Sequence, residues 1–231
     1  MLERRRVCIA AVAAFLALCG SAAAAELSQA VRQLYVSLSL QPPSESQMTV
    51  CYGFGCRLRW HLEFTTADKK RLTDILAAGR ASPAAERKAV QQAVVWFDRR
   101  VGPIIGTEKR IPNADIRSFD APHNFDCFDT TRNTVSLLLV LEHWGLLKHH
   151  TVGDPRYRGN IFIGQLPHNT AVLNDRQTGI GWVVDMWPTG YGERGSDVFD
   201  PPQGHGARGR HQHLRRSVSS REVSQGLVQR R

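Results

Sequence analysis

The chain has 231 residues, a formal net charge of +9 and five cysteines. Its basic excess lies at the ends, because residues 1–25 hold three arginines and one glutamate and residues 201–231 hold seven arginines and one glutamate. Residues 26–200 are therefore close to +1, so the basic pI is mostly a property of the tail and says little about the partners of the body. We expect no specific nucleic-acid partner, and a tail that contacts anionic surfaces loosely.

The first 25 residues have the three parts of a secretory signal peptide. MLERRR is basic, VCIAAVAAFLALCG is apolar but too short to span a bilayer, and SAAAA supplies small residues for cleavage after Ala25. No later stretch is apolar enough for a membrane helix, so we expect a periplasmic or secreted protein without a transmembrane segment. Residues 26–200 are long enough for one domain, and the composition of residues 201–231 predicts a disordered tail.

Hydrophobic spacing predicts helices first and strands last. Helices are expected over residues 27–40, 65–79, 82–102 and 126–144, with an antiparallel hairpin over residues 49–64. Ser82 and Pro83 mark the start of the third helix, and Gly145 follows the end of the fourth. Irregular chain is expected over 103–123, and strands in GNIFIGQL, HNTAVLND and GIGWVVDMW. Helices followed by an antiparallel sheet make an α+β fold.

The cysteines divide by position. Cys8 and Cys19 leave with the signal peptide, so three remain. CYGFGC places two glycines between Cys51 and Cys56, which permits a tight turn, and an oxidising compartment favours a disulfide between them. Two free thiols and metal ligation are the alternatives. Cys127 is then unpaired, which in an exported protein makes it a candidate reactive thiol.

Cys127 also begins the fourth helix, which is apolar all round from Leu137 to Leu141 and should lie at the centre of the domain. The first turn of a helix has free N–H groups and the positive end of the dipole, and both favour a thiolate. A small buried hydrophobe is the alternative for Cys127. His149 and His150 follow this helix, and we expect both at the surface.

The C-terminal strands offer a base for this thiol and a partner for the base. A four-residue loop that pairs Asn174 with Gly179 places His168 directly opposite Asp185, close enough for an imidazole–carboxylate hydrogen bond. A surface histidine and a backbone-bound carboxylate are the alternatives. In this register the other face carries a large apolar set that suits a core: Ala171, Leu173, Ile180, Trp182 and Val184. A slip of one residue would separate His168 from Asp185.

The order Cys127, His168 and Asp185 resembles the transglutaminase-like branch of the papain-like superfamily. The gaps of 41 and 17 residues fit that branch, and DCFD around the cysteine is similar to the DCxD of the bacterial transglutaminase-like cysteine proteinases. The resemblance covers roughly residues 120–190. It implies a papain-like α+β core whose central helix carries the nucleophile Cys127, with His168 as base and Asp185 as its orienting partner. It also implies acyl transfer from amide bonds.

The chain departs from that family at two points. Some members bind calcium through acids beside the cysteine, but Phe128 stands where an acid is expected, so no cofactor is predicted and calcium is the alternative. No clear upstream glutamine marks the oxyanion hole. Asn124 and His123 are nearby candidates, with the Cys127 backbone N–H as the other donor, although Asn124 fits a turn or cap equally well. Trp187 is expected to shield the three residues or to line the substrate cleft.

Two functions of different class remain. The first is an exported cysteine hydrolase that acts on a protein or a cell-wall peptide. The second is an inactive domain of the same fold that binds a peptide or partner protein, with Cys127 inert. The sequence does not choose between hydrolysis and transamidation.

Overall fold

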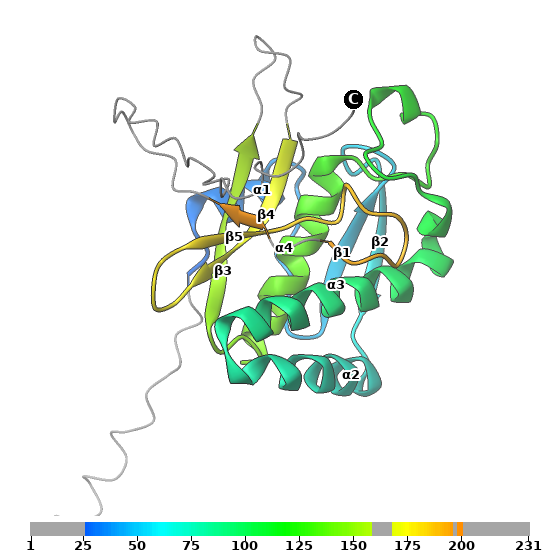
Figure 1. Cartoon of the computed structure of the whole chain (residues 1–231). Coiled ribbons are helices and arrows are strands. Elements are labelled where there is room, and N and C mark those ends of the chain that lie inside the picture. Colours follow the sequence, from blue (N-terminus) through cyan, green and yellow to red (C-terminus); the bar gives the residue numbers. More distant parts are fainter. Residues whose placement is uncertain (1–25, 159–167, 196–197, 201–231) are drawn as a thin grey trace, which may run out of the picture.

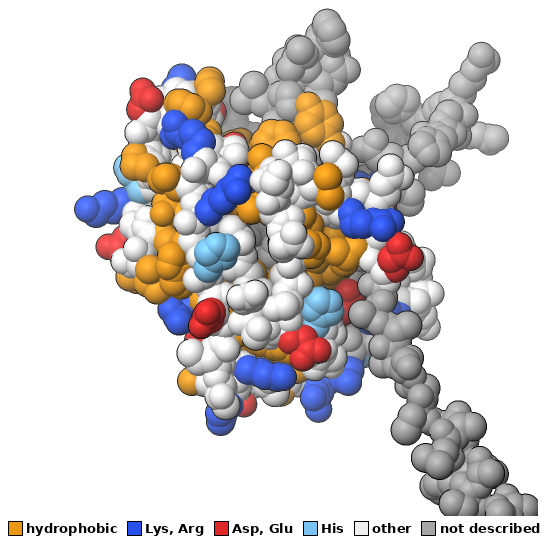
Figure 2. All heavy atoms as spheres, turned by 180° about the vertical axis from the view of Figure 1, so that it is seen from behind, with side chains coloured by type: hydrophobic (Ala, Val, Ile, Leu, Met, Phe, Trp, Pro, Cys, Tyr) orange, Lys and Arg blue, Asp and Glu red, His pale blue; other side chains and the backbone are white. Residues whose placement is uncertain are grey.

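The computed structural model describes residues 26–158, 168–195 and 198–200, and it has the α+β fold that the sequence predicts (Figure 1). The expected signal peptide, the strand expected over 159–166 and the basic tail lie outside the described residues. Among the described residues, no helix is long and apolar enough to cross a membrane. Figure 2 shows the face opposite to that of Figure 1, where basic and acidic side chains are interspersed.

The N-terminal half contains three helices and a hairpin. Helix α1 spans Gln29–Val36, and strands β1 (Gln47–Tyr52) and β2 (Leu58–Glu63) form the predicted antiparallel pair. Helices α2 (Thr66–Ala77) and α3 (Pro83–Ile105) follow, joined by the 3-10 turn η1 (Ala78–Ala81). Ser82 caps α3 by accepting the Ala85 N–H, as predicted. Two further 3-10 turns, η2 (Thr107–Lys109) and η3 (Ile116–Ser118), interrupt the expected irregular segment.

Helix α4 (Cys127–His143) runs through the middle of the molecule, between the larger sheet and the β1–β2 hairpin (Figure 1). Asp126 caps its start by accepting the Asp129 N–H, and Gly145 follows its end with a positive φ of 66°. Every residue from Asp129 to Leu141 is buried, because the helix is covered on several sides. The apolar core therefore forms around α4, with contributions from all the helices and from both sheets.

The larger sheet has the antiparallel order β3 (His150–Arg158), β4 (His168–Asp175), β5 (Gly181–Val184) and β6 (Val198–Asp200). The sequence predicts β4 and β5 but misses β3. The reason is visible in the pairing, since β3 contains Pro155 and the register shifts between Gly153 and Arg156. A bulge can accommodate a proline that a regular ladder would exclude.

The predicted register of β4 and β5 is wrong by two. Asn174 pairs with Gly181 rather than with Gly179, and Ala171 pairs with Val184. Asp175 belongs to the strand, since its N–H donates to the Ile180 carbonyl at 2.9 Å, so the four-residue turn begins one residue later than predicted. A shift of two preserves the faces of a strand. Ala171, Leu173 and Val184 accordingly lie in the core, as predicted.

His150 is buried, which corrects its predicted place at the surface, whereas His149 is only partly buried. The His150 side chain is 0% exposed and its Nδ1 lies 2.9 Å from the Glu86 carboxylate, which is itself 1% exposed. Glu86 also accepts the N–H groups of residues 148–150. Burial opposes the charge of Glu86, but these bonds hold the pKa of Glu86 below its ordinary value. The cluster ties α3 to the chain that enters β3.

Candidate active site

Cys127 is the first residue of α4 and is buried, with 9% of its surface exposed. In the described part of the chain it is the free cysteine, because Cys51 and Cys56 form the predicted disulfide. The Thr130 N–H donates to the Asp126 carbonyl and the Asp129 N–H to the Asp126 side chain. Within the described residues, the N–H groups of Cys127 and Phe128 have no acceptor. Two free donors therefore lie beside the sulfur.

The disulfide closes a left-handed turn over residues 51–56, here called the disulfide turn. Its residues 53–56 all have positive φ angles, between 60° and 76°. Gly53 and Gly55 adopt this conformation at little cost, whereas Phe54 and Cys56 do so against the usual preference of L-residues. The sequence predicts the tight turn and its bridge, but not the run of four left-handed residues.

Backbone N–H groups of the disulfide turn form hydrogen bonds with residues at the start of α4. The Gly53 N–H donates to the Asn124 carbonyl at 3.0 Å, and the Gly55 N–H to Asp126 Oδ2 at 2.7 Å. The Phe54 and Cys56 N–H groups donate to the two oxygens of Asp129, at 2.9 and 2.6 Å. Consecutive N–H groups in such a turn form a concave anion site, and here the anions are the protein's own carboxylates.

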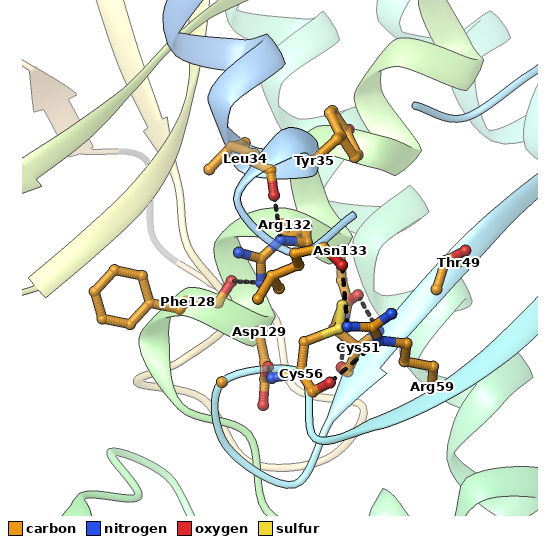
Figure 3. Close-up of a disulfide and its surroundings, with 12 residues drawn as sticks. Leu34, Tyr35, Thr49, Cys51, Cys56, Arg59, Phe128, Asp129, Arg132 and Asn133 are labelled. Atoms are coloured by element: carbon orange, nitrogen blue, oxygen red, sulfur yellow. Dashed lines mark hydrogen bonds between the residues drawn. A yellow bond between two sulfur atoms is a disulfide. The ribbon is translucent and has the colours of Figure 1, made fainter. Parts of the chain in front are cut away.

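Asn133 completes this attachment one turn further along α4. Its Oδ1 accepts the Cys51 N–H and its Nδ2 donates to the Cys51 carbonyl, both at 2.8 Å. Figure 3 shows Asp129 and Asn133 directed from α4 toward the disulfide turn, with Phe128 on the other side. Burial and the Asp126 carboxylate raise the pKa of Asp129 to about 7, although the N–H groups of Cys56 and Phe54 favour its charge.

These supporting residues were missed at the level of sequence. Asp126, Asp129 and Asn133 are spaced by three and four residues, so they share one face of α4. Polar residues on one face of an otherwise apolar central helix are the signal that could have found them. Their partners lie more than 70 residues away in the chain, and that part could not be predicted.

His168 and Asp185 do meet, although not directly opposite each other on the ladder. His168 Nε2 lies 2.5 Å from Asp185 Oδ2, and their side chains are 20% and 16% exposed. The ladder ends at the Ala171–Val184 pair, so the contact forms diagonally beyond it. Asp185 Oδ1 accepts the Trp187 N–H at 2.9 Å, which fixes the carboxylate on its second side.

The other nitrogen of His168 is left for Cys127. His168 Nδ1 is buried and has no hydrogen-bond partner among the described residues, while the Cys127 sulfur is near enough to affect the ring's charge. Burial alone would lower the pKa of His168. The hydrogen bond and charge of Asp185, together with the nearby Cys127 sulfur, outweigh it and raise the pKa of His168 to about 9. The structure thus brings together the three residues that the sequence singles out.

Trp187 and Asn124 both lie near this group in supporting positions. The Trp187 ring packs against the His168 ring in a tilted arrangement, with the ring centroids 4.6 Å apart. The Trp187 indole N–H donates to the Ala114 carbonyl. Asn124 is buried, and its Oδ1 accepts the Ile111 N–H at 3.0 Å. This bond supports the loop before α4, and the role of Asn124 in an oxyanion hole stays a prediction. Across the described ranges, no group of three or more His, Cys, Asp or Glu side chains is placed to hold a metal ion.

Comparison of the chain with protein-family models, with curated proteins and with solved structures finds no match in any of the three.

Proposed function

We propose that the protein is an exported cysteine hydrolase of the transglutaminase-like type, which cleaves amide bonds through Cys127, His168 and Asp185. The observation that carries the proposal is the orientation of the His168 ring. Its Nε2 is held by Asp185, and its buried Nδ1 is the nitrogen that remains for the Cys127 sulfur. A nucleophile, a base and an orienting carboxylate in this order are the parts of a triad.

In the first half of the reaction, the Cys127 thiol gives its proton to His168 Nδ1, and the thiolate attacks the carbonyl carbon of the substrate. A C–S bond forms and the carbonyl π electrons move to oxygen. When the tetrahedral adduct collapses, the C–N bond breaks and Nδ1–H protonates the departing amine. The raised pKa of His168 suits a ring that must hold this proton until the amine leaves.

In the second half, water attacks the thioester carbonyl while His168 Nδ1 takes its proton. The C–S bond then breaks, and the sulfur recovers the proton from the ring. Asp185 accepts the hydrogen bond from Nε2–H, which leaves Nδ1 free for both transfers. An amine in place of water would give transamidation, and the same residues would serve it.

The oxyanion that forms at the carbonyl needs donors near the sulfur. The N–H groups of Cys127 and Phe128 are free of acceptors within the described residues and lie at the positive end of α4. The disulfide turn supports this role, because it fixes the start of α4 through Asp126 and Asp129.

The proposal is tested by incubating the protein with a diverse peptide library and identifying cleavage products by mass spectrometry. We expect native protein to produce new termini and Cys127→Ala to produce none. We expect His168→Ala to lose activity by at least about a hundredfold, since it removes the general base. His61→Ala is the matched control, because His61 is an exposed strand histidine, and it should keep full activity. Products that persist with Cys127→Ala, or their absence with native protein, would contradict the proposal.

A further inference from the structure

A second concave site lies away from the three residues, between α2 and α3. It is a cavity of about 420 Å³, and Cys127, His168 and Asp185 do not line it. Figure 1 shows α2 and α3 side by side along one end of the molecule. Gln92, Trp96 and Arg99 are spaced by four and three residues, so one face of α3 forms a wall. Pockets that hold small molecules have volumes of this size.

The lining of this cavity is basic without compensation. It contains Arg71 from α2, Arg99 from α3 and Arg194 from the chain after β5, and none of the described residues that line it is acidic. In the part of the chain that the structure describes, Arg71 and Arg194 make no hydrogen bond or ion pair. Arg99 makes one weak contact, from Nη2 to the Gly192 carbonyl at 3.2 Å. Three arginines therefore line one cavity, and most of their guanidinium donors have no partner among the described residues.

Neighbouring basic residues of the same two helices behave differently. Lys70 pairs with Asp74 at 2.7 Å, and Arg100 pairs with Asp68 at 3.2 Å. Among the described residues, Arg71 and Arg194 therefore differ from Lys70 and Arg100, each of which has a carboxylate partner.

The wall that carries Arg194 is held by a buried ion pair. Arg110 Nη1 lies 2.6 Å from Asp98 Oδ1, and both side chains are 3% exposed. Arg110 also donates to the Gly190 carbonyl at 2.9 Å, and Asp98 Oδ2 accepts the Gly192 N–H at 2.5 Å. The chain on the far side of the cavity is therefore fixed to α3 before any ligand binds.

Gly192 is required at the closest point of this wall. Its φ is +69°, and a Cβ atom added there would lie 2.8 Å from Arg99 Nε. A side chain at position 192 would push Arg99 away and strain the backbone. Glycine therefore lets the wall approach Arg99 closely, which sets the width of the cavity at its arginine side.

We propose that this cavity binds an organic phosphate ester, a small molecule with a phosphate group and a planar or apolar part. Arginine forks match phosphate oxygens in geometry and charge, and Arg71, Arg99 and Arg194 supply three of them. Trp96, Ile75 and Val95 line the same cavity and supply an aromatic and aliphatic surface for the rest of the ligand. This binding does not depend on the proposed hydrolase activity, because the two sites share no lining residue.

The test is calorimetric titration of the whole mature chain with phenyl phosphate, inorganic phosphate and phenol. We expect saturable binding of phenyl phosphate, weaker binding of inorganic phosphate and no measurable binding of phenol. The double variant Arg71→Gln, Arg194→Gln should lower the affinity for phenyl phosphate by about tenfold or more, since loss of one hydrogen bond to a charged group lowers affinity by about that factor. Both side chains are exposed, so melting temperature should not change. The variant Trp96→Leu should remove the preference for phenyl phosphate over phosphate.

The matched control is Arg117→Gln, which removes an exposed arginine outside the cavity. It should leave the affinity for phenyl phosphate unchanged. The proposal is overturned if the binding of phenyl phosphate does not saturate or if the double variant binds it with native affinity. It is also overturned if Arg117→Gln lowers the affinity for phenyl phosphate as much as the double variant does. Cys127→Ala should bind phenyl phosphate normally, so failure of the hydrolase proposal would be seen separately.

Discussion

The candidate active site has two parts, which are held in place in different ways. We call the start of α4 with the disulfide turn the cysteine arm, and His168 with Asp185 the strand arm. The cysteine arm is held by a disulfide and by backbone hydrogen bonds, because the disulfide turn donates four consecutive N–H groups to Asn124, Asp126 and Asp129 around the start of α4. The strand arm depends on one diagonal ion pair beyond the end of a ladder, supported by the Trp187 N–H and ring. The position of Cys127, the proposed nucleophile, is thus set by backbone contacts, and that of His168, the proposed base, by side-chain contacts.

This difference has a consequence for mutation. Damage to the disulfide turn should act on the stability of the fold and on the site together, since α4 is also the centre of the core. Damage to His168 or Asp185 should act on chemistry and leave the core intact, since both side chains lie at its edge.

The largest effect is expected from breaking the cysteine arm with the double variant Cys51→Ser, Cys56→Ser. Loss of a disulfide usually costs about 2–4 kcal/mol, and the left-handed residues 54 and 56 would then have no covalent restraint. We expect the free energy of unfolding in urea to fall by that amount, with loss of amide cleavage. The single variant Cys127→Ala removes a sulfur atom but no disulfide. Its free energy of unfolding should lie within about 1 kcal/mol of that of native protein.

The pH dependence of stability separates the two arms. The pKa of His168 rises on folding from 6.5 to about 9, so the folded state keeps a proton that the unfolded state releases. This stabilisation is complete below pH 6.5 and is lost as pH rises through 9, with a total of at most about 3 kcal/mol. The pKa of Asp129 rises from 3.8 to about 7, so its contribution is lost between those values as pH rises.

We therefore expect the free energy of unfolding to fall across both windows as pH increases. His168→Ala should remove the fall in the free energy of unfolding between pH 6.5 and 9 only. Asp129→Asn should remove only the fall between pH 3.8 and 7. Urea titrations at several pH values measure this directly. A native curve that rises between pH 6.5 and 9 would mean that His168 is not held as a cation.

A smaller effect is expected from Asp129→Asn at constant pH. Both carboxylate oxygens accept backbone N–H groups, so asparagine must turn its NH₂ group toward one of those donors. We expect a loss of about 1–3 kcal/mol in the free energy of unfolding. Asp74→Asn is the matched control, because its exposed pair with Lys70 is worth less than about 1 kcal/mol. Equal losses in the two variants would show that the disulfide turn does not depend on Asp129.

Local signals predicted much of this fold. The starts of α3 and α4 and the stop at Gly145 depend on caps that lie within a few residues of each helix end. The disulfide was predictable for the same reason, since Cys51 and Cys56 are only five residues apart. The pairing of His168 with Asp185 was predictable in kind, because a register error of two keeps both side chains on one face.

The predictions that were wrong, and the features that were not predicted, depend on contacts between residues that local sequence patterns do not encode. The β4–β5 turn was misplaced because Asp175 still belongs to the strand, where it pairs with His150, and its carboxylate accepts the Gln177 and Thr178 N–H groups. The burial of His150 depends on Glu86, which is 64 residues away. The attachment of α4 to the disulfide turn is equally distant in the chain, so neither could be derived from local spacing.

The central claim is that His168 activates Cys127, and alkylation of Cys127 by iodoacetamide tests it most directly. The rate should be measured against pH by mass spectrometry for native protein, for His168→Ala and for the control His61→Ala. We predict that at neutral pH native protein and His61→Ala react at the same rate, and His168→Ala at least about tenfold more slowly, because the thiolate has lost its cationic partner. If native protein and His168→Ala follow the same curve, His168 does not activate the thiol and the account of the site is wrong.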